Sequence, residues 1–280
     1  MIRGLIFTGI YYVISAYFVL TALPLLLLPW RGPIRWHIKN YTRCVNLLLR
    51  YVCGIRKEVR GRENLPDGPY ILAPKHASWG DGFLIYPEIE KLGFVTGDHL
   101  EKLPLVGGIL GKLGAIVIRT CGGGDGKAKS LIAGIERIKG QNRRLLIYPE
   151  GHLAPVGFHF RYKAGVWHIQ QALNIPIVPV ATNLNCYWQQ EEMRKSPGVA
   201  VLEFLPPIPP GLSKDDALQQ LTQSVETRSA ELIGEALKRP PRPSQVLPEP
   251  VKGHVPNPTG PAEAVALLRR LNQDGLARQS

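Results

Sequence analysis

Cysteines are scarce in this sequence, and none of them belongs to a paired motif. The four cysteines lie at positions 44, 53, 121 and 186, and no two are spaced as CxxC. A thiolate zinc site needs such spacing, and a disulfide framework is typical of short, cysteine-dense chains. The sequence therefore argues against both and favours reduced thiols in a cytosolic setting.

Charged side chains are absent between Gly4 and Trp30. This stretch contains an apolar run that exceeds the roughly 20 residues needed to cross a bilayer as a helix. A signal peptide is the alternative interpretation, but its apolar core has only about 7 to 15 residues. Pro24 can kink the helix into a shallow rather than a spanning path. We therefore expect this segment to enter lipid.

Acidic side chains are nearly absent from the first sixty residues, which hold nine Lys and Arg residues and one acid, Glu58. Wound at about 100° per residue, residues 34–54 form an amphipathic helix with a basic stripe over about 80° and an apolar stripe over about 100°. The basic stripe comprises Arg35, Lys39, Arg43, Asn46 and Arg50, and the apolar stripe comprises Ile34, Ile38, Tyr41, Val45, Leu48, Leu49 and Val52.

This amphipathic helix has two interpretations. It can pack on the domain with its charges in water, or it can lie along an anionic leaflet, where each cation contributes about 1 kcal/mol. The adjacent apolar segment favours the leaflet. Basic residues on this flank predict a protein on the cytoplasmic face of the cell membrane, attached through its N-terminal segment.

Short apolar runs alternate with helical patterns over residues 70–237. Predicted strands cover 70–74, 93–97, 115–120, 144–150, 175–181 and 199–205, and predicted helices cover 82–91, 127–139, 163–172 and 213–237. Several strands are apolar on both faces, as in sheets covered by helices on both sides. The predicted fold class is α/β, with a central largely parallel or mixed sheet flanked by helices and preceded by a membrane-associated helical segment.

The same patterns predict three regions. Residues 1–54 are expected to be membrane-attachment helices, and residues 55–238 a catalytic domain. Residues 239–280 are expected to form a proline-rich linker and a short C-terminal helix.

The stretch "KHASWGD" places His76 five positions before Asp81. Neither a continuous helix nor a strand makes two such positions neighbours, whereas a bend between a strand ending at Pro74 and a helix beginning after Gly80 does. There Asp81 could orient the imidazole of a general base, as in base-assisted acyl transfer. The alternative is that both residues serve the helix start, His76 as a cap and Asp81 in the first turn.

A second acid points to the same edge of the sheet. "YPEG", residues 148–151, ends another predicted strand, and the carboxyl ends of parallel strands share one edge. We therefore expect Glu150 to lie near His76.

Several stretches in this order resemble the 1-acylglycerol-3-phosphate acyltransferase (lysophospholipid acyltransferase, HxxxxD) family over residues 56–235. They are "KHASWGD", "GAIVIRT", "YPEG" and "IPIVPVA", with "RGRENLP" and "RYKAGVWHIQ" as similar connecting text. The resemblance implies that His76 removes a proton from a glycerol hydroxyl, which attacks the thioester of acyl carrier protein or coenzyme A. Asp81 is its partner, and no metal, cofactor or acyl-enzyme is required.

The resemblance also implies the remaining site residues. Glu150 and Gly151 match the third motif, in which the acid arranges the acceptor and catalytic loops. Pro179 matches a proline that shapes the last motif. The second motif covers Arg119 and Thr120.

The chain departs from the family's pattern where basic side chains bind the acceptor phosphate. His152 and Leu153 stand where the third motif commonly has threonine and arginine, and Thr120 stands at the usual arginine position, with Arg119 one residue early. The candidate substrate-binding residues are Gly151, Arg119, Thr120, His152 and Lys163, with Arg161 as a further possible phosphate contact. A solvated surface role remains the alternative for Arg119, Arg161 and Lys163. Asp98, at a position often occupied by lysine, suits an acceptor with an amine or a neutral sugar.

Other sites and partners are disfavoured. Nucleic acid would explain the net charge of +12, but the basic residues flank a lipid-seeking segment rather than exposed aromatics. The glycine-rich run "CGGGDGKAKS" lacks the spacing of a phosphate-binding loop. Three histidines, His152, His159 and His168, lack the supporting ligand spacing of a zinc site.

The sequence thus predicts a membrane-attached O-acyltransferase of phospholipid biosynthesis. It transfers a fatty acyl chain from acyl carrier protein or coenzyme A to a lysophospholipid, by default 1-acylglycerol-3-phosphate. An acyltransferase for a lyso-aminolipid or glycolipid and a non-catalytic lipid-binding protein are the alternatives.

Overall fold

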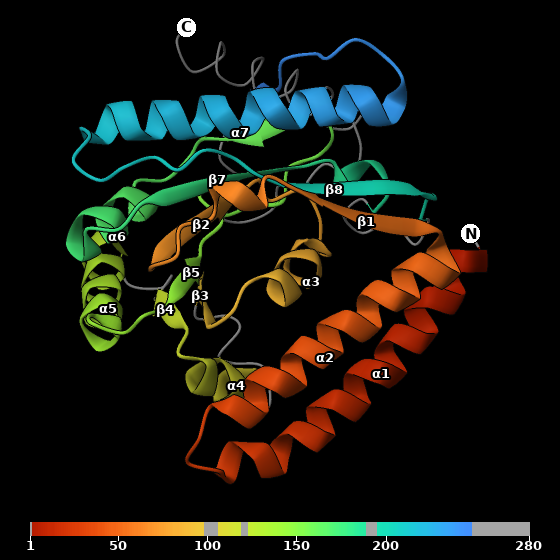
Figure 1. Ribbon diagram of the computed structural model, residues 1–280, viewed down its shortest axis with the longest axis horizontal. Coiled ribbons are helices and arrows are strands. Elements are labelled where there is room, and N and C mark those ends of the chain that lie inside the picture. The colour runs from red at the N-terminus through yellow and green to blue at the C-terminus, as the bar shows by residue number, and fades with distance from the viewer. Residues whose placement is uncertain (1, 98–105, 119–122, 189–194, 248–280) are drawn as a thin grey trace, which may run out of the picture.

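A seven-stranded mixed sheet forms the centre of the domain in the computed structural model, which describes residues 2–97, 106–118, 123–188 and 195–247 (Figure 1). The strand order is β1-β8-β7-β2-β5-β3-β4. The strands are β1 (Ile55–Arg60), β2 (Tyr70–Pro74), β3 (Leu92–Gly97), β4 (Ile116–Ile118), β5 (Arg144–Leu146), β7 (Ile177–Thr182) and β8 (Gly198–Phe204). Every neighbouring pair is parallel except β7 and β8. The prediction of a largely parallel or mixed α/β sheet is confirmed.

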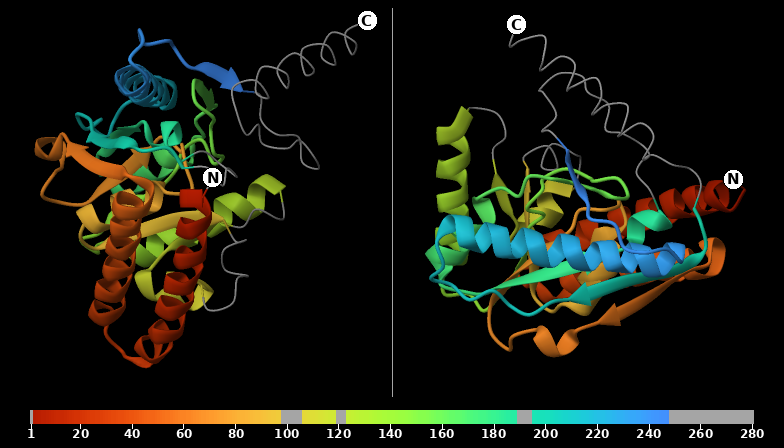
Figure 2. Two further views of the ribbon diagram at one scale, coloured as in Figure 1. Left: turned by 90° about the vertical axis from the view of Figure 1, so that its right-hand side faces the viewer. Right: turned by 90° about the horizontal axis from the view of Figure 1, so that it is seen from above.

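Helices cover both faces of this sheet because its central strands are apolar on both sides (Figures 1 and 2). In β2, Ile71 and Ala73 face a cluster that includes side chains of α5, α6 and α7. Tyr70 and Leu72 alternate with them and face α3 and part of α2. The helices are α1 (Ile2–Leu27), α2 (Gly32–Leu48), α3 (Asp81–Ile85), α4 (Val106–Leu113), α5 (Gly123–Ile138), α6 (Gly165–Leu173) and α7 (Lys214–Leu237).

Several elements differ from the sequence prediction. The predicted strand over 115–120 is described only at Ile116–Ile118, and the one over 144–150 ends at Leu146, before the YPEG turn. The predicted helix 82–91 divides into α3 and a 3₁₀ turn at Tyr86–Glu88, where Pro87 supplies no backbone N–H. Strand β1 was missed because charged residues interrupt its apolar alternation.

The proline-rich segment after α7 returns to the domain. Residues Gln245–Leu247 form β9, which pairs in parallel with β6 (Phe158–Phe160), apart from the main sheet. The prolines of this segment lie outside the paired residues, as expected because proline has no backbone N–H to donate to a strand. The C-terminal helix expected from the sequence lies outside the described residues.

Helices α1 and α2 form an antiparallel hairpin along one side of the domain (Figures 1 and 2). Among the described residues, α1 is the one helix long and apolar enough to cross a membrane by length and composition. Its inner face packs on α2, with the hydroxyl groups of Ser15 and Tyr41 2.8 Å apart and His37 Nε2 2.9 Å from the Phe18 carbonyl oxygen. Its outer face exposes Leu5, Tyr12, Val13, Tyr17, Leu20 and Leu27.

The apolar stripe of α2 faces protein rather than lipid. Ile34, Val45 and Leu48 are buried, and Asn46 donates a hydrogen bond to the Phe83 carbonyl in α3. The packing interpretation therefore holds for this stripe, because side chains of α1, α3 and α4 cover it. A lipid contact of α2 would have to use its other side, where Trp36 and Leu47 are exposed.

Helix α1 also contributes to the core beneath α3. Phe7 is 2% exposed and meets the buried Trp188 edge to face, with ring centroids 5.2 Å apart. Trp188 in turn stacks against Phe83 of α3. The N-terminal helix is thus both an apolar outer surface and a structural part of the domain.

We expect Phe7→Ala to destabilise the protein by about 3 to 5 kcal/mol, because it leaves a cavity against Trp188. Val13→Ala is the matched control on the same helix: Val13 is 71% exposed, so its loss should change stability by less than about 0.5 kcal/mol. Denaturant unfolding in detergent measures both. Equal midpoints for the two variants would contradict the packing of α1 described above.

Candidate active site

The turn between β2 and α3 brings His76 and Asp81 together. His76 Nδ1 lies 3.2 Å from Asp81 Oδ2, the same oxygen that accepts hydrogen bonds from the backbone N–H groups of Ala77 at 2.7 Å and Ser78 at 2.9 Å. Asp81 is 3% exposed and begins α3. It therefore holds the turn before α3 and orients the imidazole at once, which leaves Nε2 of the partly exposed His76 to meet a substrate.

Glu150 ties this turn to the next motif. One carboxylate oxygen accepts from the backbone N–H of His76 and the other from that of Phe160, both at 2.9 Å. The carboxylate is fully buried, so it acts through the backbone and offers no free oxygen to a substrate. Parallel pairing of β2 and β5 brings the two segments to one edge of the sheet, as expected.

Tyr148 supports the imidazole from one side. Its ring stacks on that of His76 with centroids 4.0 Å apart and an interplanar angle of 20°. Burial raises the pKa of the Tyr148 phenol well above its usual value, and the Asp81 carboxylate adds to this effect. The stacking partner of His76 is therefore a neutral ring, a role that the sequence reasoning missed.

Gly80 allows the turn to approach the aromatic cluster beneath α3. A Cβ atom at this position would lie 2.6 Å from Trp188 Cε3, too close without a shift. Gly80 has ordinary helical backbone angles, so the requirement is for space rather than for a special conformation. The Trp188 ring therefore contacts both Phe7 of α1 and Gly80 of the catalytic turn.

The residues after Glu150 lie in a second turn. Gly151 has a positive φ of +70°, and a Cβ atom there would lie 2.9 Å from Lys163 Nζ. The exposed Lys163 therefore places its ammonium group beside the third motif. His152 is half-buried with its ring 5.3 Å from that of Phe160, and Leu153 is buried.

The predicted residues of the second motif, Arg119 and Thr120, lie outside the described residues, as does Asp98. Strand β4 ends at Ile118, beside β3. Pro179 lies in β7, where it pairs with Ala73 of β2 and supports the strand that precedes His76.

Charged groups behind Glu150 were also missed. Lys75 and Glu226 are buried, and Lys75 Nζ lies 2.8 Å from both carboxylate oxygens of Glu226. Lys75 precedes His76 and could have been suspected, but nothing in the sequence links Glu226 of α7 to the motif. Burial raises the pKa of Glu150 to about 7, an effect that Lys75 opposes and Glu226 reinforces.

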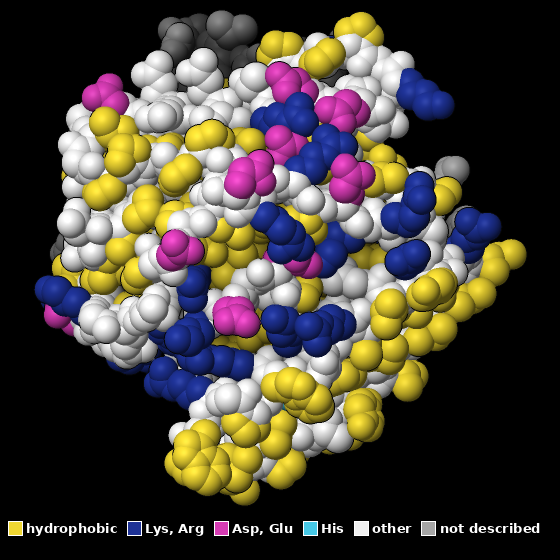
Figure 3. Space-filling model, viewed as in Figure 1, with side chains coloured by type: hydrophobic (Ala, Val, Ile, Leu, Met, Phe, Trp, Pro, Cys, Tyr) yellow, Lys and Arg dark blue, Asp and Glu magenta, His cyan; other side chains and the backbone are white. Residues whose placement is uncertain are grey.

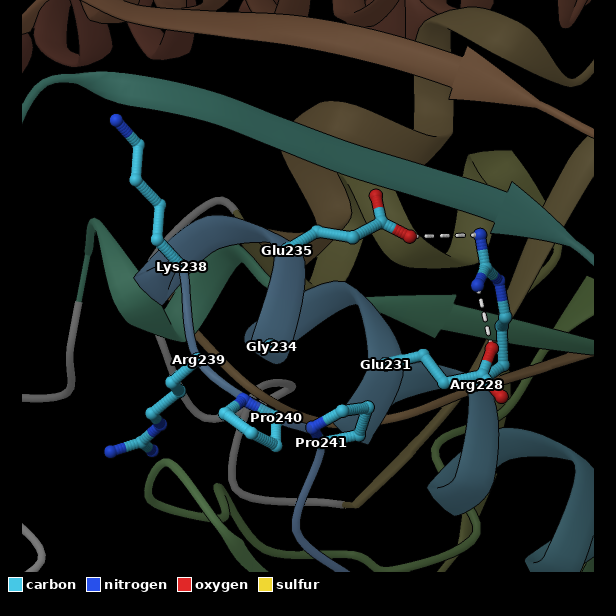
Figure 4. Close-up of a pocket in the computed structure, with 8 residues that line it drawn as sticks. All are labelled: Arg228, Glu231, Gly234, Glu235, Lys238, Arg239, Pro240 and Pro241. Carbon is cyan, nitrogen blue, oxygen red and sulfur yellow. Dashed lines mark hydrogen bonds and ion pairs between the residues drawn. The ribbon is translucent and has the colours of Figure 1, made fainter.

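A shallow hollow at the C-terminal end of α7 is lined by other residues than the site around His76 (Figure 4). Arg228 pairs there with Glu231 at 2.6 Å and with Glu235 at 3.4 Å, and Lys238 and Arg239 also line the hollow. None of the predicted site residues lines it. Within the described ranges, no three His, Cys, Asp or Glu side chains are grouped as a metal site.

The chain is similar to known acyltransferases. A family model described as Acyltransferase matches residues 56–183. The chain is 30% identical over 209 residues to the 1-acyl-sn-glycerol-3-phosphate acyltransferase of Pseudomonas aeruginosa, which covers 75% of this chain and 81% of that protein. It is 29% identical over 182 residues to the human 1-acyl-sn-glycerol-3-phosphate acyltransferase alpha, which covers 62% of each chain.

The fold has a counterpart among solved structures. The crystal structure of the 1-acyl-sn-glycerophosphate (LPA) acyltransferase PlsC from Thermotoga maritima superposes with a TM-score of 0.67 at 21% identity. The superposition covers 82% of this chain and 96% of that one.

Proposed function

This chain belongs to the 1-acyl-sn-glycerol-3-phosphate acyltransferase family, and we propose that it transfers a fatty acyl chain from a thioester to the free hydroxyl of 1-acylglycerol-3-phosphate. It is an O-acyltransferase. The observation that supports the chemistry is the hydrogen-bonded pair of His76 and Asp81, held by Glu150 at the carboxyl edge of the sheet.

In this proposal His76 is the general base. Its Nε2 takes the proton of the acceptor hydroxyl as the oxygen attacks the thioester carbonyl carbon. The carbon–sulfur bond then breaks, and the imidazolium returns the proton to the leaving thiolate. Asp81 holds the Nδ1 tautomer and stabilises the imidazolium while it exists. The step needs no cofactor, and the donor is acyl carrier protein or coenzyme A carrying the acyl group.

Recognition of the acceptor phosphate falls to Lys163 in this proposal. The arginine usual in the third motif is replaced by the buried Leu153, which cannot reach an anionic headgroup. The Lys163 ammonium, from the segment between β6 and α6, lies beside Gly151 and can make a charge-assisted hydrogen bond to phosphate. Gly151 provides the space for that approach, and the half-buried His152 borders it. Arg119 and Thr120 remain substrate-binding proposals from the sequence.

The apolar outer face of α1 and family membership indicate membrane association. Figure 3 shows hydrophobic side chains along the edge formed by α1 and α2, with Lys and Arg side chains beside them. Because the inner face of α1 packs on α2 and on the domain, we propose that the hairpin lies in one leaflet rather than spanning the bilayer. The basic flank favours the cytoplasmic leaflet.

Purified protein given an acyl donor should acylate 1-acylglycerol-3-phosphate faster than lyso-aminolipids or lyso-glycolipids. His76→Ala should lower that rate roughly 10²- to 10⁴-fold, because the general base is lost. His168→Ala, at an exposed position of α6, is the control and should retain the parent rate. Unchanged turnover in His76→Ala would disprove the assignment of the base, and preference for another headgroup would disprove the acceptor.

Lys163→Met should raise KM for 1-acylglycerol-3-phosphate on the order of tenfold or more, since one charge-assisted hydrogen bond is lost. The rate constant at saturation should change less. Lys139→Met, at an exposed position just after α5, is the matched control. An equal effect of the two substitutions on KM would count against Lys163 as the phosphate contact.

Charges on the outer face of α1 should release the protein from membranes. Val13→Glu combined with Leu20→Glu replaces two exposed apolar side chains, and vesicle co-sedimentation should fall several-fold, because carboxylates are costly to transfer into lipid. Ile132→Glu, on the exposed side of α5, should leave sedimentation unchanged. Persistent binding of the double variant would refute attachment through α1. Cleavage of the domain by protease added outside intact cells would refute the cytoplasmic face.

A further inference from the structure

Lys75 carries a buried positive charge directly behind the catalytic turn. Its side chain is 1% exposed, and its ammonium group lies within hydrogen-bond distance of three oxygens: the Phe158 carbonyl at 2.9 Å and both carboxylate oxygens of Glu226 at 2.8 Å. These partners use its three donors. Glu150 Oε1 lies 4.0 Å from the same nitrogen, close enough for a strong charge interaction without a direct hydrogen bond.

Glu226 connects this ammonium group to α7, which packs on the same face of the sheet as α5 and α6. It comes from the middle of α7 and is 7% exposed. Besides Lys75, it accepts a hydrogen bond from the Tyr162 hydroxyl at 2.9 Å, and the Ser244 side chain of the returning C-terminal segment also bonds to it. A buried charge is costly unless it is paired, so Lys75 and Glu226 are each strongly favoured to keep the other as partner.

The protonation state of Glu150 affects how firmly the catalytic turn is held. Its two oxygens accept from the backbone N–H groups of His76 and Phe160. An ionised carboxylate accepts at both oxygens, whereas a protonated carboxyl carries a donor on one of them. Protonation would therefore weaken one of the two bonds that join the turn to β6.

We propose that Lys75 and Glu226 are positioning residues for acyl transfer: their buried ion pair places a cation behind Glu150 and so keeps Glu150 as the double acceptor that holds His76. This proposal rests on the proposed function for its effect on turnover. Neither residue touches the substrate. Lys75 favours the ionised carboxylate, and Glu226 fixes Lys75 while limiting how strongly that cation acts on Glu150.

Other titratable groups around Glu150 also contribute to its environment. Among the described residues they are His76, Asp81, His159, Tyr162 and Lys163. None of them is substituted in the Lys75 and Glu226 variants, but Tyr162 and His159 both contact Glu226 and lose its charge in Glu226→Gln. Lys75→Met leaves those two contacts with Glu226 unsubstituted.

The arrangement predicts opposite effects of two substitutions. In Lys75→Met, Glu150 loses its neighbouring cation and faces Glu226 alone, so its protonation midpoint should rise by about 1 to 3 pH units. In Glu226→Gln, the negative neighbour is gone and Lys75 has Glu150 as its one remaining carboxylate partner, so the midpoint should fall. Since the ionised form is active, the acid limb of kcat should move to higher pH in the first variant and to lower pH in the second.

The experiment uses the full chain in detergent. The infrared band of protonated carboxyl groups is followed against pH, and Glu150→Gln identifies the part of the band that belongs to Glu150. Opposite shifts in Lys75→Met and Glu226→Gln support the proposal. Shifts in the same direction, or an unmoved midpoint in either folded variant, overturn it, because a residue that only fills space would not act on the midpoint by its charge.

If an unpaired charge prevents either single variant from folding, the double variant Lys75→Met/Glu226→Leu removes both charges and leaves an apolar pair. Its Glu150 midpoint should still lie above that of the parent, since the cation has the larger effect of the two, and an unchanged midpoint would overturn the proposal. The infrared measurement does not depend on turnover. Failure of the parent to acylate any lyso-lipid would therefore reject the proposed function separately.

Discussion

The buried Glu150 carboxylate is the contact on which the geometry of the site depends. It joins two segments that are far apart in the sequence, because its oxygens accept from the backbone of His76 on one side and of Phe160 on the other. Placing this acid in a fully buried position is costly, and burial alone favours its neutral form. The nearby Lys75 ammonium offsets part of that cost, so the turn that carries the imidazole is held by charge as well as by the sheet.

Asp81, like Glu150, makes several contacts with one carboxylate. One oxygen accepts from the backbone N–H groups of Ala77 and Ser78 in the turn before α3 and also faces the imidazole. Loss of this carboxylate would therefore disturb the turn and the base together. Asp81 does lie in the first turn of α3, but His76 does not cap the helix, because the N-cap residue is Gly80. The contacts support the interpretation of Asp81 as the acid that orients the imidazole.

The N-terminal hairpin connects the lipid-facing surface to the chemistry. Phe7 of α1 packs on Trp188, and Trp188 lies against Gly80 in the catalytic turn. Apolar side chains therefore divide between two tasks, with one face of α1 in the core and the other available to a membrane. This arrangement suits an acceptor whose acyl chain lies in the leaflet and whose hydroxyl group lies near the leaflet surface, where a base on the catalytic turn can meet it.

The α/β class, the long apolar helix and the candidate pair of His76 and Asp81 could be predicted from the sequence, because they follow from local periodicity and from the spacing of a few side chains along one turn. The family's pattern led to Glu150 as well. Three further features became visible in the folded chain alone: α2 buries its apolar stripe in protein, Leu153 is buried while Lys163 approaches Gly151, and Glu226 pairs with Lys75. These contacts join residues from separate elements, and their partners depend on how helices pack across the sheet, which no local pattern records.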